Sequence, residues 1–196
     1  MSAAFSDVQP EALLKFVREY PLAWVVPEAK PAAAMLMSLV VETDEEGLPA
    51  YLIGHLPKHS PAAKALAEDT SATCLFLGPN AYMQPQWVSQ TKWGPTWNFV
   101  SLKLGADLAL SDDLAAPALQ ALTTQLEDTK GSAAWSTDQM GERFEQLLKA
   151  LTGFRAPISS MEPRFKLGQD ENETTFDELL AGLGDHPLAG WMSGGR

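Results

Sequence analysis

Cysteine and long apolar runs are what this sequence most clearly lacks. Its only cysteine, Cys74, cannot form a disulfide within one chain, and it lies in the apolar segment ATCLFLG (72–78), a setting typical of a buried, unreactive thiol. No apolar run approaches the roughly 18 residues that span a bilayer. The opening segment MSAAFSDVQPEALLKF (1–16) has no basic flank followed by an apolar core, as a signal peptide would. We therefore expect a protein of the reducing cytoplasm with no membrane segment.

Positive charge is also scarce. The chain has 14 basic and 25 acidic residues, which gives a net charge of −11. An acidic chain repels polyanions over long distances, and nucleic-acid binding by a single copy would need a basic patch that works against this repulsion. No helix–turn–helix with a basic second helix is evident. We therefore expect the protein alone not to bind duplex DNA.

Several signatures of cofactor and metal sites are absent. The sequence contains no G-x-x-x-x-G-K and no G-x-G-x-x-G motif, which argues against the two common glycine-rich phosphate sites. It contains no C-x-x-C and no H-E-x-x-H. The three histidines, His55, His59 and His186, do not have the spacing of metal ligands, although His55 and His59 are four residues apart. The sequence therefore predicts no metal site.

What the chain does have is a series of short apolar segments of strand length. The apolar patterns and turn signals predict strands at 22–26, 34–43, 48–56, 71–78, 95–104 and 154–168, with 34–56 forming a hairpin around the turn DEEG (44–47). Helices are predicted at 6–20, 60–69, 111–128, 137–153 and 174–184. The strands follow one another without regular strand–helix alternation. This order favours an α+β fold, with an antiparallel sheet or small barrel and helices packed outside.

Some details of these helices can be tested individually. Ser6 and Asp7 are candidate caps of the first helix. In 137–153 one face carries an apolar stripe, and Gly153 is expected to end that helix; the stripe consists of Met140, Phe144, Leu147, Leu148 and Leu151. The last residues, DHPLAGWMSGGR (185–196), are expected to form a loose tail. We expect a barrel domain over 1–170, including a helical insertion at 111–152, followed by a C-terminal helix and tail at 171–196.

The segment GHLPKHSPAAK (54–64) has the features of a phosphate site. A predicted strand ends there, and a helix begins with Ser60 as its N-cap and Pro61 at its first position. The first N–H groups of a helix have no partner within the helix and favour an anion. Lys58 and Lys64 add positive charge on either side. The alternative interpretation is a strand–loop–helix corner with solvated surface lysines.

Three of the six tryptophans, Trp87, Trp93 and Trp97, lie within the segment AYMQPQWVSQTKWGPTWN (81–98). In an extended 96–104, Trp97 points to one face, while Thr96 and Asn98 point to the other. Aromatic residues on a sheet usually belong to a core or an interface. The functional alternative is a wall for a flat aromatic ligand, with Thr96 and Asn98 as hydrogen-bonding groups.

Taken together, these segments resemble the PaiB family, FMN-binding negative transcriptional regulators of the flavin-binding split-barrel superfamily. The matching motifs are Gly54-His55-Leu56, GPNAYMQPQW (78–87), PTWNF (95–99), GFRAPI (153–158) and FKLGQ (165–169). Among its departures from the family pattern, the chain has Lys58 for Arg, Ser60 for Asn, Asn80 for His and Gln84 for Ser. A lysine keeps the charge of an arginine but loses its bidentate phosphate geometry.

The resemblance implies a six-stranded antiparallel split barrel and a homodimer with FMN at the subunit interface. It makes 54–64 the phosphate end of the flavin site and the tryptophan-rich segment part of the wall around the flavin ring. The implied FMN-binding residues are His55, Lys58, Ser60, Lys64, Tyr82, Trp87, Thr96, Trp97 and Asn98. Two other functions stay open. One is an FMN-dependent oxidoreductase or flavin reductase, for which no catalytic residue stands out, and the other is a haem-binding split-barrel protein with His55 or His59 as ligand.

Overall fold

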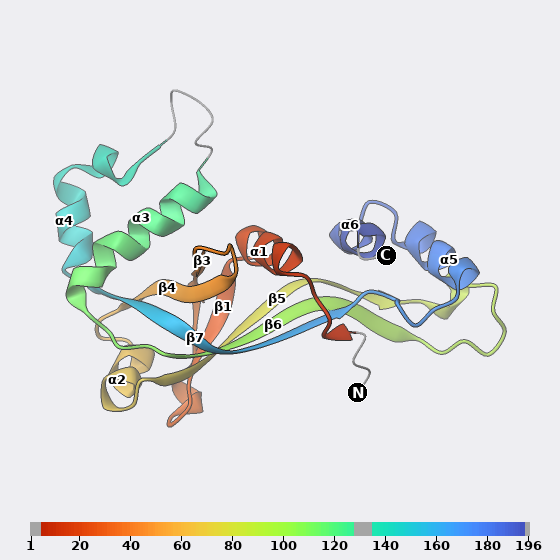
Figure 1. Cartoon of the computed structure of the whole chain (residues 1–196), viewed down its shortest axis with the longest axis horizontal. Helices are drawn as coiled ribbons and strands as arrows, with labels where there is room; N and C mark the ends of the chain where they lie inside the picture. Colours follow the sequence, from red (N-terminus) through yellow and green to blue (C-terminus); the bar gives the residue numbers. More distant parts are fainter. Residues whose placement is uncertain (1–4, 128–134, 195–196) are drawn as a thin grey trace. The chain divides into compact units, whose positions relative to one another are not determined.

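The structure, a computed structural model, describes residues 5–127 and 135–194 (Figure 1). The chain divides into two compact units. We call Pro10–Phe76 with Lys103–Met161 the barrel unit, and Met1–Gln9, Leu77–Leu102 and Glu162–Arg196 the C-terminal unit. Within the described ranges, no helix is both long and apolar enough to cross a membrane.

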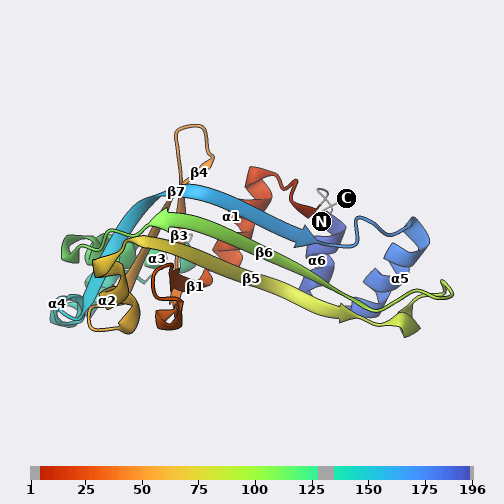
Figure 2. The ribbon, with the colours of Figure 1, turned by 90° about the horizontal axis from the view of Figure 1, so that it is seen from below.

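Seven strands form one sheet. Its order is β2-β1-β5-β6-β7-β4-β3, and the pairs β1–β2, β1–β5, β3–β4 and β4–β7 are antiparallel. The three long strands β5, β6 and β7 contribute residues to both units and run side by side (Figure 2). The strands are β1 (Leu22–Pro27), β2 (Met35–Ser38), β3 (Val40–Thr43), β4 (Pro49–Pro57), β5 (Ser71–Met83), β6 (Thr96–Asp107) and β7 (Leu151–Lys166).

The predicted strand 34–43 is two strands, which is why the sheet has seven strands and not six. β2 and β3 are separated by Leu39 alone, yet they lie at opposite edges of the sheet order. Because consecutive Cα atoms are 3.8 Å apart, the two edges must come together, so the sheet is curled into a barrel. Leu39 is fully buried, and its N–H donates to the carbonyl of Pro21 (2.9 Å). The seam of the barrel is the point where its two edge strands, β2 and β3, meet at Leu39. Burial of the Leu39 side chain there explains why the continuous apolar run 34–43 forms two strands.

The core of the barrel unit fills the inside of this curl. Its fully buried large side chains come from α1, α2, the strands β4 to β7 and the short connections after β2 and β6, and they include Phe16, Leu39, Leu52, Leu56, Leu66, Phe76, Leu104, Leu108 and Phe154. α1 (Pro10–Glu19) places Leu13, Leu14, Phe16 and Val17 on its buried face. The helix begins at Pro10, so the expectation that Ser6 and Asp7 cap it is wrong. A proline is well suited to a first helical position because it has no N–H to leave unpaired.

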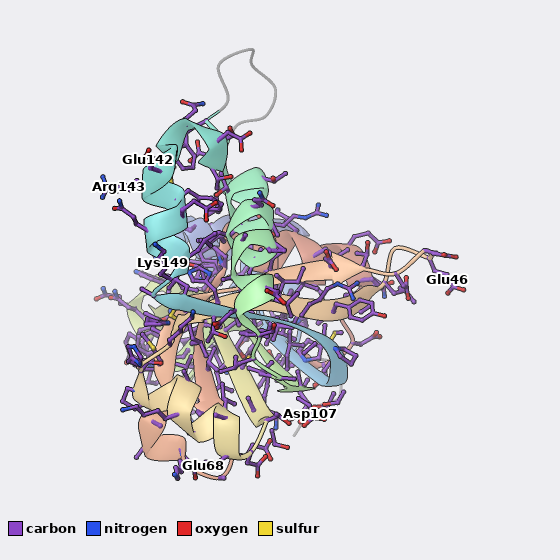
Figure 3. The ribbon with its side chains drawn as sticks, turned by 90° about the vertical axis from the view of Figure 1, so that its left-hand side faces the viewer. Glu46, Glu68, Asp107, Glu142, Arg143 and Lys149 are labelled. Atoms are coloured by element: carbon purple, nitrogen blue, oxygen red, sulfur yellow. The ribbon has the colours of Figure 1, made fainter. Side chains whose placement is uncertain are left out.

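Two helices of the barrel unit come from the segment between β6 and β7. They are α3 (Ala115–Leu126) and α4 (Glu142–Leu148). Two helices are expected here, but α4 is shorter than the predicted helix 137–153. Gly141, with φ 53°, separates α4 from the 3-10 turn Thr137–Met140, because this backbone conformation suits glycine and ends a regular helix. None of the α4 residues is buried, so the expected apolar stripe does not form a core; Glu142, Arg143 and Lys149 project outward at this helix (Figure 3).

Gly153 does not end a helix, contrary to expectation, because it belongs to β7. It pairs with His55 of β4 and forms an isolated bridge with Ser111. A Cβ at Gly153 would lie 2.3 Å from the backbone of Leu114. The absence of a side chain therefore allows β7 to approach the start of α3 closely.

The C-terminal unit contains α5 (Glu173–Leu183) and α6 (Pro187–Gly194). α5 agrees with the predicted helix 174–184, and Asn172 caps it by accepting the N–H of Thr175 (3.0 Å). The expected loose tail is wrong, because α6 buries Leu188, Trp191 and Met192. The rings of Trp191 and Phe165 meet edge to face, with their centroids 5.7 Å apart. This aromatic contact holds the end of the chain in place.

Candidate functional site

The start of α2 (Pro61–Glu68) has the predicted cap. The Oγ of Ser60 accepts the N–H of Ala63 (3.1 Å), and the carbonyl of Ser60 accepts the N–H of Lys64 (3.1 Å). Pro61 has no N–H. Ala62 is fully buried, so its N–H is not accessible to a ligand. The hydroxyl hydrogen of Ser60 is a donor of this first turn, because its Oγ only accepts in the cap.

Lys58, just before α2, forms an ion pair. Its Nζ donates to Oδ2 of Asp112 at 2.8 Å, and its backbone N–H donates to the carbonyl of Ala150. The hydrogen bond from Lys58 lowers the pKa of the Asp112 carboxyl, which keeps that carboxylate charged. Lys64 is exposed on α2 and has no ion-pair partner within residues 5–127 and 135–194. An anion at this end would share Lys58 with Asp112, a residue that the sequence reasoning did not identify.

His55 lies near the end of β4 and is half-buried. Its Nδ1 is buried and has no hydrogen-bond partner in the part of the chain that the structure describes. Burial lowers the pKa of the imidazole, because desolvation disfavours the charged form. The side chain is therefore a neutral imidazole at physiological pH.

The tryptophan turn, residues 84–95, lies between β5 and β6 in the C-terminal unit, and α5 holds it. The indole of Trp87 covers Gly182 so closely that a Cβ there would lie 2.3 Å from Cδ2 of the ring. Nε1 of Trp93 donates to both carboxylate oxygens of Glu171, at 3.0 and 3.1 Å. Two of the three clustered tryptophans are therefore fixed by contacts with the region around α5.

Polar groups of the tryptophan turn reinforce this attachment. The N–H of Ser89 donates to Oε2 of Glu178 (2.7 Å), and this bond lowers the pKa of the Glu178 carboxyl. Oε1 of Gln90 accepts from Oγ1 of Thr175 (3.0 Å) and from Nδ2 of Asn172 (3.2 Å). Sequence reasoning missed these partners, because they lie far along the chain in what looks like a solvated acidic helix.

The third tryptophan, Trp97, is different because it is 53% exposed. Its ring meets that of Tyr82, itself 44% exposed, at a centroid distance of 6.1 Å and an angle of 60°. A flat ligand can contact exposed aromatic faces of this kind, which gain from offset or edge-to-face packing. Among the predicted ring-side residues, this pair is the one available to a ligand.

Thr96 and Asn98 point away from Trp97, as the strand alternation predicts. Oγ1 of Thr96 accepts a hydrogen bond from Nζ of Lys166. Asn98 is 1% exposed, and its Nδ2 lies 3.8 Å from Sδ of Met192 in α6. Oδ1 of Asn98 is buried without a partner among the described residues. Lys166, within the FKLGQ segment, is a positive charge that sequence reasoning did not assign to a role.

The nine predicted site residues thus fall into two groups. Those of the barrel unit surround the end of β4 and the start of α2, and they are His55, Lys58, Ser60 and Lys64. Those of the C-terminal unit lie on β5, β6 and the tryptophan turn, and they are Tyr82, Trp87, Thr96, Trp97 and Asn98. The described residues contain no cluster of three or more His, Cys, Asp or Glu that could hold a metal ion.

Comparisons with known proteins give consistent similarities. A family model described as "Putative FMN-binding domain" matches residues 1–160. The chain is 25% identical over 182 residues to "Protease synthase and sporulation protein PAI 2" of Bacillus subtilis (strain 168), and the match covers 91% of this chain and 86% of that protein.

Solved structures share the fold at low sequence identity. The FAD and heme binding protein from Mycobacterium smegmatis has a TM-score of 0.62 at 19% identity, covering 93% of this chain and 82% of that one. The flavocytochrome Anf3 from Azotobacter vinelandii has a TM-score of 0.58 at 14% identity, covering 82% and 69%. At these identities the likeness concerns the fold alone.

Proposed function

The chain belongs to the FMN-binding split-barrel family that includes PaiB, and on that premise we propose that it is a dimeric flavoprotein that holds the FMN phosphate at the start of α2. FMN, when bound, supplies redox chemistry through its ring system. The observation that carries the proposal is the donor set at this helix start, in a chain with few positive charges.

The residues present there fit a phosphate. Ser60 offers a hydroxyl, and Lys58 and Lys64 offer ammonium groups on either side of the helix start. Asp112 opposes the phosphate, because it accepts from Lys58 at 2.8 Å. The proposal therefore includes a competition between Asp112 and the phosphate for Lys58. On the ring side, Trp97 and Tyr82 offer exposed aromatic faces.

The test is a comparison of FMN with riboflavin, which lacks the phosphate, in fluorescence titrations of the purified chain. A charge-assisted hydrogen bond contributes about 1.5–3 kcal/mol, so Lys58→Ala should weaken FMN binding by roughly ten-fold or more and largely remove the preference over riboflavin. Asp112→Asn should tighten FMN binding, because it removes the competing carboxylate. Lys15→Ala, at an exposed lysine of α1, is the control and should change nothing. Unchanged FMN affinity in a Lys58→Ala, Lys64→Ala double variant would show that the phosphate binds elsewhere.

An exposed apolar row on the outer face of the barrel unit supports the proposal that the protein is a homodimer. Trp24 pairs with Leu36 on one side and with Leu75 on the other, so the three side chains form a row across β2, β1 and β5. They are 41 to 51% exposed. Contiguous apolar surface of this kind is typical of an interface. Light scattering should give twice the 21.2 kDa chain mass, and Trp24→Lys should reduce it; a monomer at micromolar concentration would contradict the dimer.

The resemblance to the PaiB family implies a role in transcription, and we propose that such a role here does not use direct DNA contact. The net charge of −11 opposes approach to a polyanion. Gel retardation at physiological salt should show no shift of duplex DNA by the protein alone. A tight, sequence-specific shift would establish a direct regulator instead. Bleaching of bound FMN by NAD(P)H would establish a reductase.

A further inference from the structure

A cavity lies in the barrel unit, among residues that the flavin proposal does not use. Its volume is about 590 Å³, and it is open to solvent. Arg18 of α1, Val40 and Val41 of β3, and Ala121 and Gln125 of α3 line it. Figure 1 shows β3 beside α1 and α3. A volume of several hundred cubic ångströms is the usual size of a site for a small molecule.

The floor of this cavity is apolar and continuous with the core. Val40 is buried in a cluster with Ile53 and Ala118, and Ala121 and Leu122 pack against that cluster. A ligand group on this floor would be removed from water, which favours an aliphatic group over a polar one. The floor alone gives no specificity, because it offers only methyl groups.

A buried amide donor and an exposed arginine lie beside the apolar floor. Nε2 of Gln125 is buried and has no hydrogen-bond acceptor in the described part of the chain. Such a donor destabilises the protein until an acceptor reaches it. Arg18, in the last turn of α1, is exposed and has no ion-pair partner within residues 5–127 and 135–194. The buried Gln125 donor lacks an acceptor among the described residues, and the exposed guanidinium of Arg18 favours an acceptor with negative charge.

A carboxylate in the cavity wall limits how much negative charge a ligand can carry there. Glu42 also lines the cavity, and its Oε2 accepts from Nε of Arg155 at 2.7 Å. The Arg155 charge therefore compensates the Glu42 charge, and the cavity keeps the single positive charge of Arg18. A dianion such as a phosphate monoester would meet one guanidinium and the nearby Glu42. A carboxylate needs only one positive charge and matches the planar fork of arginine.

We propose that this cavity binds a small monocarboxylate with an aliphatic tail. The carboxylate accepts from the guanidinium of Arg18 and from Nε2 of Gln125, and the tail lies on Val40 and Ala121. This site is separate from the residues assigned to FMN, so its test does not depend on the flavin proposal.

Calorimetric titration of the full chain with octanoate, in the presence of FMN, tests the proposal. Octanoate should bind with one site per chain, whereas octanol, inorganic phosphate and acetate should bind at least ten-fold more weakly. Arg18→Gln should weaken octanoate binding at least ten-fold. Arg143→Gln is the matched control, because Arg143 projects from α4 outside the cavity (Figure 3), and it should leave the affinity unchanged. FMN affinity should be the same in all of these proteins.

A second variant distinguishes a ligand-binding role of Gln125 from a merely structural one. Gln125→Leu removes the buried donor that has no acceptor, so it should raise the melting temperature of the ligand-free chain and weaken octanoate binding about ten-fold. A surface amide without a role would change neither quantity. Absence of octanoate binding, binding that neither variant weakens, or equal binding of inorganic phosphate would each overturn the proposal.

Discussion

The start of α2 and the tryptophan turn are held in opposite ways. At α2 the decisive hydrogen bond joins Ser60 to Ala63, three residues apart. In the tryptophan turn the bonds join Trp93 to Glu171 and Ser89 to Glu178, which are 78 and 89 residues apart. The first arrangement needs only its own segment. The second exists only when the C-terminal helices have folded.

This difference has a consequence for the family relationship. The family model matches residues 1–160, whereas the partners of the tryptophan turn lie at 171–182, beyond the match. The phosphate end is therefore built from chain that the family describes throughout. The tryptophan turn depends on a C-terminal segment outside that description, and the variants below separate the two regions.

The largest loss of stability is expected from Gly182→Ala, which displaces Trp87 of the tryptophan turn. The new Cβ would lie 2.3 to 2.7 Å from three atoms of the Trp87 indole, so the ring must move. Alanine favours a helix over glycine by roughly 1 kcal/mol, but overpacking costs about 1–3 kcal/mol or more. We expect a net loss of about 1–2 kcal/mol in urea unfolding, with a red shift of tryptophan emission.

The control for this variant is Gly190→Ala in α6, where a Cβ would meet no atom within 4 Å. That variant should keep or increase stability, because only the helix preference acts. If Gly182→Ala were as stable as Gly190→Ala and emitted at the same wavelength, Trp87 would not be fixed on α5 in solution.

A smaller effect is expected at the start of α2. Ser60→Ala removes the acceptor of the Ala63 N–H, and loss of such a cap costs about 1 kcal/mol. Because the contact is local, the emission of the docked tryptophans should not change. Ser60→Thr keeps a hydroxyl cap and should restore most of the stability. Urea midpoints of the three proteins provide the measurement, and equal midpoints would contradict the role of the cap.

The smallest and most specific effect is a pH dependence at His55. Burial lowers the folded-state pKa of this imidazole below its ordinary value of 6.5. As pH falls through 6.5, the unfolded chain binds a proton before the folded chain does, so His55 reduces stability as pH falls from 7.5 to 5. His55→Gln should make the free energy of unfolding less dependent on pH in this range. A slope in His55→Gln identical to the native slope would refute the assignment.

Sequence reasoning succeeded where the determining contacts are local. The cap at Ser60, the turn before β4 and the separation of Trp97 from Thr96 follow from neighbouring residues. It failed at Leu39, because a continuous apolar run does not reveal that one residue turns inward at a barrel seam. The docking of Trp93 on Glu171 was not predictable either, because it depends on how two distant segments meet.

One error was avoidable. The expectation of a loose tail at 185–196 overlooks that Leu188, Trp191 and Met192 have helical spacing and that Pro187 stands at the first helical position. An apolar face of one turn is a weak signal until a partner such as Phe165 is known.

The seam at Leu39 also bears on how the barrel forms. In most curled sheets the two edges meet only after a long loop has closed, and the loss of chain entropy on closure slows folding. Here the edges are consecutive strands joined by one residue, so bringing them together requires almost no loop closure. The slow events should instead be the distant pairings of β1 with β5 and of β4 with β7. Once these have formed, Leu39 already holds the two edge strands next to each other.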